Sequence, residues 1–329
     1  MKLLSRLFFA LLAGGAFLVS AHAQSQPVAL TLKTPIPFRF VAFGDTRFHD
    51  PADTKPANPE IRRALVAAIA QENPVFISIG GDIVLDGDNA KDWQVWDAET
   101  SLWRERKIPV YPAIGNHELH GDLNTDLANY FQRFPELQKN RFYSTRVANS
   151  LMLVLDSNLD EITGPQGAWL TAQLDHLPAD VDFVFFVFHH PPYTSSSDLK
   201  ILGGGHSARP TEQALAKMLE DRQQRTRARF VVFNGHVHNY ERHEHGGVTY
   251  FVTGGGGARP YLIARAPDDL YKDTGINYHY LLVEVDHTAA KITMHKVEIK
   301  DGSPVWSTPD NVTIRVPAAV ANAAGGKTR

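Results

Sequence analysis

The sequence predicts one α/β domain that contains two β-sheets. In the first two thirds of the chain, short apolar runs alternate with segments of helical periodicity, as expected where helices connect the strands of a sheet. From about residue 248 onward the pattern shows strands alone, and this change favours two sheets over one. No internal segment has the composition of an interdomain linker, so residues 38–316 are assigned to a single domain.

Residues 1–23 have the features of a secretory signal peptide. Lys2 and Arg6 supply a positive start, Leu7–Val19 is apolar, and Ala21 and Ala23 are small residues at the positions that a signal peptidase reads. The apolar run is short for a bilayer span, so we expect cleavage and no transmembrane segment in the mature chain. Export of a chain without Cys indicates a bacterial periplasmic or extracellular protein.

The mature chain is predicted to begin with a linker, residues 24–37, and to end in a disordered tail, residues 317–329, that is rich in Ala and Gly. Between them, apolar runs of buried-strand length are Phe38–Phe43, Val75–Ile79, Pro109–Ala113, Leu151–Leu155, Phe183–Phe188 and Phe230–Phe233. The later strand patterns are Val248–Thr253, His279–Val285, Lys291–Val297 and Val312–Val316.

Three helices are predicted between the strands. Asn58 and Pro59 form a helix start, because Asn caps the first turn and Pro is favoured in it, and apolar residues then recur at helical spacing. Two further helices are expected over Pro165–Leu177 and Thr211–Arg222. The strands therefore end in loops that lead into helices.

Composition excludes several classes of function. The 329 residues include 33 Lys and Arg, 36 Asp and Glu, 15 His and no Cys. A net charge of −3 without a basic stripe gives no reason to expect stable nucleic acid binding. The absence of Cys excludes disulfides, thiolate zinc sites, iron–sulfur clusters and a cysteine nucleophile. The many His residues are either scattered over the surface or bind metal.

Polar side chains that can bind metal follow five of the six predicted buried strands. They are Asp45, Asp82, Asn116, His189 and the pair His236 and His238. Ligand groups converge at the carboxyl ends of strands in α/β folds, so this joint placement indicates one site. Carboxylate, amide oxygen and neutral imidazole suit Fe, Mn or Zn. Two such metals bridged by a carboxylate would hold a hydroxide for an in-line displacement at phosphorus.

These residues lie in motifs that resemble the five blocks of the calcineurin-like metallophosphoesterases. In family order, the blocks are Gly44-Asp45, Gly81-Asp82, Gly115-Asn116-His117-Glu118, the His189 strand end and Gly235-His236-Val237-His238. The continuation of the last block through Arg242 is similar to the purple acid phosphatase branch, as are Phe142-Tyr143-Ser144 and Leu155-Asp156-Ser157. The resemblance covers about residues 38–300. It implies a four-layer α/β/β/α sandwich of two mixed sheets, with a dinuclear metal centre at the strand ends.

The resemblance also implies a role for each residue. Asp82 bridges two metal ions, Asp45 and His238 complete the first site, and three further ligands form the second. These three are Asn116, His189 and His236. His117 contacts the substrate phosphate and protonates the leaving oxygen, and Glu118 orients it. His190 is expected to support the ligands from a loop, while Arg47 and His206 are candidates for substrate contact.

Two positions depart from the family pattern. Many members have Asp-x-His in the first block, where this chain has Arg47, and purple acid phosphatases supply a Tyr where this chain has Leu85. The first site therefore lacks its usual fourth protein ligand, and we expect it to bind metal weakly and the purple tyrosinate colour to be absent. His49 could complete the site by moving in, or Arg47 could contact phosphate as a fixed cation.

The function that the resemblance implies is exported, metal-dependent hydrolysis of a small phosphate ester. A metal-activated hydroxide would attack phosphorus with His117 as general acid, as in an acid phosphatase acting on monoesters. A phosphodiesterase, including one for cyclic nucleotides, would use the same metal residues. A second alternative is a non-catalytic protein that binds phosphate ligands, with turnover lost through Arg47 and Leu85.

Overall fold

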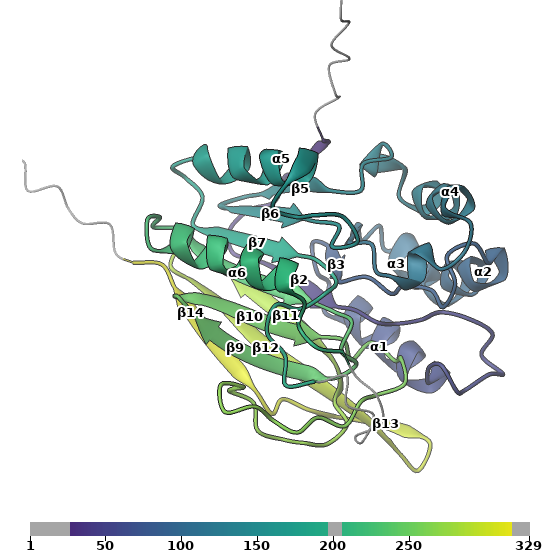
Figure 1. Ribbon diagram of the computed structural model, residues 1–329. Helices are drawn as coiled ribbons and strands as arrows, with labels where there is room; N and C mark the ends of the chain where they lie inside the picture. Colours follow the sequence, from purple (N-terminus) through teal and green to yellow (C-terminus); the bar gives the residue numbers. More distant parts are fainter. Residues whose placement is uncertain (1–26, 197–205, 318–329) are drawn as a thin grey trace, which may run out of the picture.

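The computed structural model describes residues 27–196 and 206–317, and it contains two mixed seven-stranded sheets packed face to face (Figure 1). The first sheet has the order β1 (Ala29–Leu32), β5 (Tyr143–Val147), β6 (Ser150–Val154), β7 (Phe183–Val187), β8 (Arg229–Asn234), β10 (Val248–Thr253) and β9 (Tyr240–His245). The second has the order β13 (Ser303–Ser307), β12 (Ala289–Lys300), β11 (Tyr278–Val285), β2 (Phe38–Phe43), β3 (Ile77–Ile79) and β4 (Val110–Pro112), while β14 (Asn311–Arg315) also pairs with β12.

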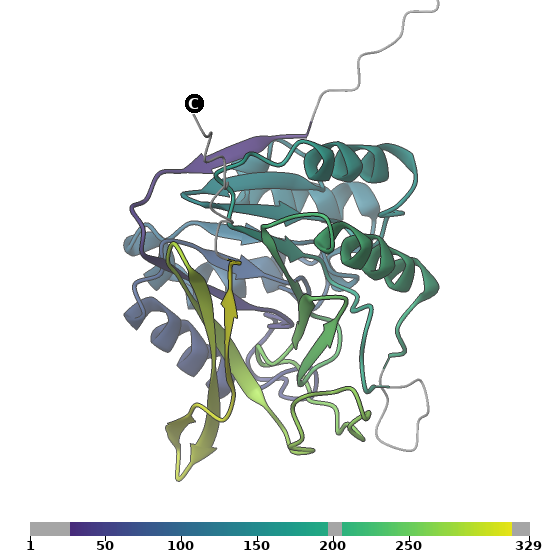
Figure 2. The ribbon, with the colours of Figure 1, turned by 90° about the vertical axis from the view of Figure 1, so that its left-hand side faces the viewer.

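Helices cover both outer faces, which completes the predicted four-layer sandwich (Figure 2). The first sheet is covered by α5 (Gly164–Asp175) and α6 (Pro210–Gln223). The other side of the sandwich carries α1 (Pro59–Gln71), α2 (Ala90–Glu99), α3 (Ser101–Glu105) and α4 (Leu123–Arg133), with the short 3-10 turns η1 (His117–Leu119) and η2 (Pro135–Leu137). No helix in the described ranges has the length and apolar character needed to cross a bilayer.

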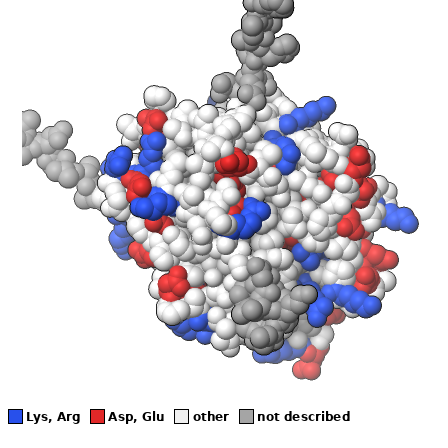
Figure 3. Space-filling model, in the orientation of Figure 1, with Lys and Arg blue, Asp and Glu red and all other residues white. Residues whose placement is uncertain are grey.

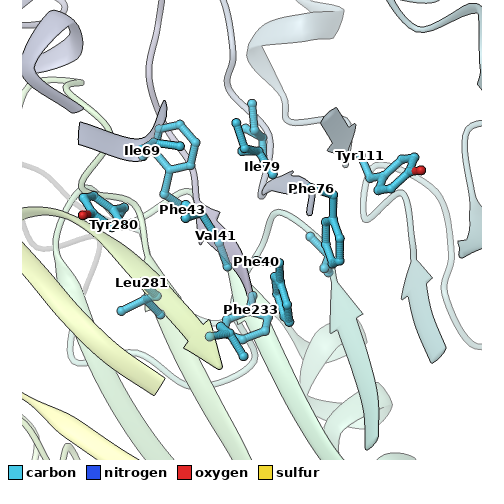
Figure 4. Packing of buried hydrophobic residues seen from close by; sticks show 14 of the residues in the cluster. Phe40, Val41, Phe43, Ile69, Phe76, Ile79, Tyr111, Phe233, Tyr280 and Leu281 are labelled. Atoms are coloured by element: carbon cyan, nitrogen blue, oxygen red, sulfur yellow. The ribbon is translucent and has the colours of Figure 1, made fainter. Parts of the chain in front are cut away.

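Strand β7 shows why both faces of the first sheet are buried. Its side chains alternate, so that Phe183 and Phe185 belong to the core between the sheets, whereas Val184 and Phe186 belong to the core beneath α5 and α6. From the opposite sheet, Phe40 meets this layer with its ring edge-on to Phe185 at 5.0 Å between centroids. Figure 4 shows Phe40 beside Phe233 of β8, the next strand of the first sheet. Because the two faces of β7 pack into two separate cores, every position of this strand is apolar.

Every strand and helix predicted within residues 38–316 is present, with its ends shifted by at most a few residues. Helix α1 begins where predicted, because the Asn58 side chain accepts hydrogen bonds from the N–H groups of Glu60 and Ile61 at 3.0 and 3.2 Å. The expected signal peptide lies outside the described residues, as does all of the expected tail except Pro317.

Part of the expected linker, residues 24–37, forms a strand of the first sheet, which corrects the prediction. It contains β1, which pairs in parallel with β5 from Ala29 opposite Ser144 to Leu32 opposite Val147. This edge strand is half-exposed and only four residues long, so its apolar alternation is too short to distinguish it from a connecting segment. Helices α2, α3 and α4, which were not predicted, are largely polar in sequence, and α2 and α3 are tied to the core through Trp93, Trp96 and Trp103.

Candidate metal centre

The loops after β2, β3, β4, β7 and β8 meet at one edge of the two sheets. Strands β2, β3 and β4 run parallel to one another, as do β7 and β8, so each group presents its carboxyl ends together. Backbone hydrogen bonds then join the loops: Asp45 N–H donates to Gly81 O at 3.0 Å, and Gly235 N–H donates to His189 O at 3.0 Å. The polar residues predicted from separate strand ends are thereby brought into one centre.

Three of the predicted ligands have left-handed backbone conformations. The φ angles are 59° at Asp45, 53° at Asp82 and 70° at His236. For residues other than Gly such conformations cost on the order of 1–3 kcal/mol each, and they concentrate at functional sites. At Gly81, also at positive φ, an added Cβ would lie 2.7 Å from Gly115 N and from His189 Nδ1, so only Gly allows the loops to approach this closely.

A second group of ligands is formed by Asn116, His189 and His236. Asn116 Oδ1 lies 3.1 Å from His189 Nε2 and 3.1 Å from His236 Nδ1, and the two ring nitrogens are 3.2 Å apart. His189 Nδ1 donates to Gly80 O at 2.8 Å, so its Nε2 carries a lone pair. Asp82 Oδ1 lies 3.2 Å from the same Nε2. Lone pairs of ligand type thus converge on one point, an arrangement that suits a cation between them.

The spacing within this second group fits a metal ion. Metal–ligand bonds of about 2.1 Å at right or tetrahedral angles place neighbouring ligand atoms roughly 3.0–3.4 Å apart, and the observed separations are 3.1–3.2 Å. Burial also lowers the pKa of His236 far below its usual range. Its imidazole is therefore neutral and available as a ligand.

A first group is formed by Asp45, Asp82 and His238, whose ligand atoms all lie within 4.8 Å of one another. His238 Nδ1 donates to Arg259 O at 2.6 Å, and its buried Nε2 has no hydrogen-bond partner in the described part of the chain and lies 3.4 Å from Asp45 Oδ1. Burial lowers the pKa of His238 to about 3 and raises that of Asp45 to about 7. Two carboxylates and a bare imidazole nitrogen therefore also face a position for positive charge.

The fourth ligand that the family pattern supplies to this first group is replaced by a cation. Arg47 places its Nη2 3.2 Å from Asp82 Oδ2, and its side chain is 14% exposed. His49 is not available to move in, because its two ring nitrogens contact the carbonyls of Arg47 and Asp53 at 2.6 Å each. The first group therefore does not match the metal site that the family implies, whereas the second group does.

His117 lies beside the residue that both groups share. Its N–H donates to Asp82 Oδ1 at 3.0 Å, its Nδ1 donates to Leu85 O at 2.6 Å, and its Nε2 is 3.8 Å from Asp82 Oδ2. The Leu85 carbonyl holds the ring so that Nε2 faces the centre. Burial lowers the pKa of His117 to about 4, although Asp82 opposes this shift.

Glu118 does not orient His117, contrary to the prediction. Its buried carboxylate accepts backbone N–H groups from Gly115, Asp82, Ile83 and Val84 at 2.7, 2.9, 2.7 and 3.2 Å. Glu118 therefore fastens the loop after β3 to the loop after β4. The motif Gly-Asn-His-Glu indicates a polar role for this residue, but it does not specify that the partners are backbone groups.

We expect Glu118→Ala to destabilise the fold by about 3 kcal/mol or more, because a buried donor left without its acceptor costs about 1–3 kcal/mol and this change affects four. Urea denaturation followed by circular dichroism measures the difference. Glu105→Ala, at an exposed position in α3, is the matched control with an expected change within about 0.5 kcal/mol. Equal stabilities for the two variants would contradict the role given to Glu118.

His190 and His206 both lie beside the second group. His190 shares a 2.7 Å hydrogen bond with Ser157 Oγ through Nδ1, and its ring centroid is 4.4 Å from that of His236. The ring of His206 is 4.0 Å from the same ring. Burial lowers the pKa of His190, so it too is neutral. The structure thus brings both candidates to the centre, His190 as a buried neighbour and His206 at its mouth.

Sequence reasoning missed His120. Its Nε2 lies 3.3 Å from Asn116 Nδ2, its Nδ1 lies 3.5 Å from Asp86 Oδ1, and its ring is 4.0 Å from that of His117. When the amide nitrogen of Asn116 donates to His120, the amide oxygen is directed into the second group. The signal was its place three residues after His117, which is the period of a 3-10 turn.

We expect His120→Ala to weaken metal binding about 10- to 100-fold, the usual effect of removing a residue that orients a ligand. Without His120, the Asn116 amide can rotate and present nitrogen instead of oxygen to the metal. Competition with a chromogenic chelator measures the change without requiring activity. His287→Ala, at an exposed position, is the control and is expected to bind metal as the wild type does. Unchanged affinity in His120→Ala would rule out this orienting role.

Comparison with known proteins identifies the class of this fold and site. Residues 38–240, more than half of the chain, match the model of the calcineurin-like phosphoesterase family. The chain therefore belongs to the calcineurin-like phosphoesterases, as its motifs predicted. A search of curated protein sequences finds no match.

Solved structures of low sequence identity share the fold. A purple acid phosphatase from yellow lupin (Lupinus luteus) seeds superposes with a TM-score of 0.65 at 18% identity, over 86% of this chain and 54% of the lupin enzyme. GAP50, the anchor in the inner membrane complex of Plasmodium, gives 0.61 at 17% identity, over 85% and 89% of the two chains. A dimetal phosphatase from Danio rerio gives 0.52 at 14% identity, over 85% and 99%. The chain thus spans about half the length of the lupin enzyme.

Proposed function

We propose that the protein is a metal-dependent hydrolase of small phosphoric esters, with phosphomonoesters as the leading substrates. The observation that carries this proposal is the shared position of Asp82. Its carboxylate contacts His189 of the second group and the backbone of His117, and it belongs to the first group with Asp45 and His238. A phosphate placed there would meet a metal, an acid and a fixed cation together.

Metal bound at this centre would supply Lewis acidity and an activated water as nucleophile, and Fe, Mn or Zn suit its oxygen and imidazole donors. The chain's own residues would perform the remaining tasks. His117 Nε2 faces the centre and would donate a proton to the leaving oxygen. Arg47, His190 and His206 would orient the phosphate. Leu85 stands where a ligating Tyr would give the purple colour, so the metal-loaded protein is expected to lack it.

The fold alone does not decide between an enzyme and a binding protein, because its structural neighbours include both a phosphatase and an anchor. The residues support an enzyme, since the complete second group and His117 are assembled in one partly buried centre. A non-catalytic phosphate-binding protein would need neither the acid nor its alignment by the Leu85 carbonyl. A diesterase, including one for cyclic nucleotides, would use the same residues.

The test is an activity panel on protein stripped of metal by a chelator and then restored with Mn²⁺, Zn²⁺ or Fe²⁺. We expect hydrolysis of p-nitrophenyl phosphate to return with at least one metal, and to exceed hydrolysis of bis-p-nitrophenyl phosphate. A faster rate on the diester would favour a phosphodiesterase. Binding of inorganic phosphate with no hydrolysis of either ester at any metal would favour the non-catalytic alternative.

We also propose export across the inner membrane to the periplasm or beyond, on the strength of residues 1–23. Mass spectrometry of the secreted chain would find a mature start near Gln24. On the face shown in Figure 3, basic and acidic side chains are interspersed, which supports a small substrate over nucleic acid as the partner.

A further inference from the structure

Arg47 is held in the centre by its backbone. It lies two residues after Asp45 with a left-handed φ of 45°, and its N–H donates to Asp82 O at 2.9 Å. Its carbonyl is contacted by His49 Nδ1 at 2.6 Å and accepts from Arg62 at 3.2 Å. An arginine exposed on the surface would not need these backbone hydrogen bonds. These bonds direct the side chain inward, toward the acidic residues of the first group.

The guanidinium meets the same residues that a first metal would need. Its Nη2 pairs with Asp82 Oδ2 at 3.2 Å, and its charge acts on Asp45 and His238. It also interacts with the hydroxyl of Tyr261, whose ring stacks on His238 with centroids 4.3 Å apart. The buried Nε–H of Arg47 has no hydrogen-bond partner among the residues that the structure describes.

The charges of the centre suit a single metal ion. Asp45 and Asp82 bring two negative charges and Arg47 brings one positive charge, so one divalent ion makes the centre positive and attractive to phosphate. A second divalent ion would have to share Asp82 with a guanidinium of the same sign, and it would find three protein ligands where the family pattern supplies four.

We propose that the guanidinium of Arg47 takes the place of the first metal ion, so that the protein binds one metal ion tightly, at Asn116, His189 and His236. The proposal rests on the proposed function for the nature of the substrate. The fixed charge neutralises Asp82 and lies beside His117, where it would attract a phosphate. Arginine suits this task because its guanidinium is a cation that offers several donors in one plane.

The first experiment restores the family pattern with Arg47→His. After loading with Mn²⁺ and dialysis, elemental analysis is expected to find one metal ion per chain in the wild type and two in the variant. Electron paramagnetic resonance gives an independent readout, since spin coupling between two close Mn²⁺ ions is expected in the variant alone. Arg63→His is the control, because it adds an imidazole at a half-exposed position on α1 and is expected to keep one metal.

The second experiment removes the charge without adding a ligand. Arg47→Gln is expected to keep one tight metal and to bind inorganic phosphate at least tenfold more weakly by calorimetry. This variant also decides the matter if Arg47→His does not fold, as a thermal melt would show. Two tight metals in the wild type, one metal in folded Arg47→His, or wild-type phosphate affinity in Arg47→Gln would each overturn the proposal.

These measurements separate the inference from the proposed function. Metal content and phosphate affinity are obtained without turnover, so a protein that hydrolyses no ester would refute the proposed function and leave the result on Arg47 standing. A wild-type protein that hydrolyses phosphate esters and holds two tight metals would support the proposed function and refute the inference on Arg47.

Discussion

Replacing His117 by Ala is expected to lower turnover of an alkyl phosphate by about two to four orders of magnitude, the usual range for loss of a general acid. The physical reason is that an alkoxide leaves with difficulty unless a proton reaches it. His117 Nε2 faces the centre, and its Nδ1 is fixed by the Leu85 carbonyl. Steady-state kinetics on glycerol phosphate with the metal-loaded variant would measure the effect.

The leaving group supplies the control for this prediction. p-Nitrophenolate leaves without a proton, so its phosphate ester should be hydrolysed by His117→Ala with a much smaller loss. Equal losses on both esters would show that His117 binds or positions the substrate and does not act as an acid. Because burial lowers the pKa of His117 to about 4, the protonated form is lost as pH rises through that value. A bound phosphate dianion raises the pKa, so the acid-dependent rate extends above it.

Replacing His236 by Ala removes a ligand from the second group and should abolish metal-dependent hydrolysis, by about a thousandfold or more. Lewis acid stabilisation of the transition state is worth several kcal/mol, and about 1.4 kcal/mol corresponds to a factor of ten. Only Asn116 and His189 would remain beside Asp82. The metal content found by elemental analysis after dialysis and the rate of p-nitrophenyl phosphate hydrolysis should both decrease.

His176→Ala, at an exposed position after α5, is the matched control and should retain both metal and activity. The fold of His236→Ala should be intact by circular dichroism, because this residue lies in a loop and its side chain contacts other polar residues of the centre. Full activity in a variant that had lost its metal would show that the second group is not the catalytic one.

The sequence predicted which candidate ligands come together, because their signal is local. Each of Asp45, Asp82, Asn116 and His189 follows a short apolar strand, and parallel strands bring such ends together whatever the details of packing. The strand pattern predicted two sheets and the family resemblance implied the four-layer sandwich, and strands such as β7, which are apolar on both faces, fit it because they need two covering layers.

The partners of polar side chains were not predictable, because they depend on contacts between distant loops. Glu118 lies next to His117 in the chain, yet its carboxylate is directed to backbone groups of the loop that follows β3. His120 acts on Asn116 through a turn whose geometry is absent from the spacing of the strands. Strand β1 was missed because four half-exposed residues carry too little pattern to signal an edge.

The sequence by itself determined the α/β class, the predicted metal-ligating residue types and the departures at Arg47 and Leu85. Only the tertiary structure decided what the departure at Arg47 means, because a substituted ligand can leave a gap, contact solvent or enter the site. The left-handed backbone of the loop and its hydrogen bonds to Asp82 and Arg62 turn the guanidinium toward the Asp82 carboxylate. The 3.2 Å contact between the Arg47 guanidinium and Asp82 depends on packing between loops that are distant in the sequence, so only the fold could reveal it.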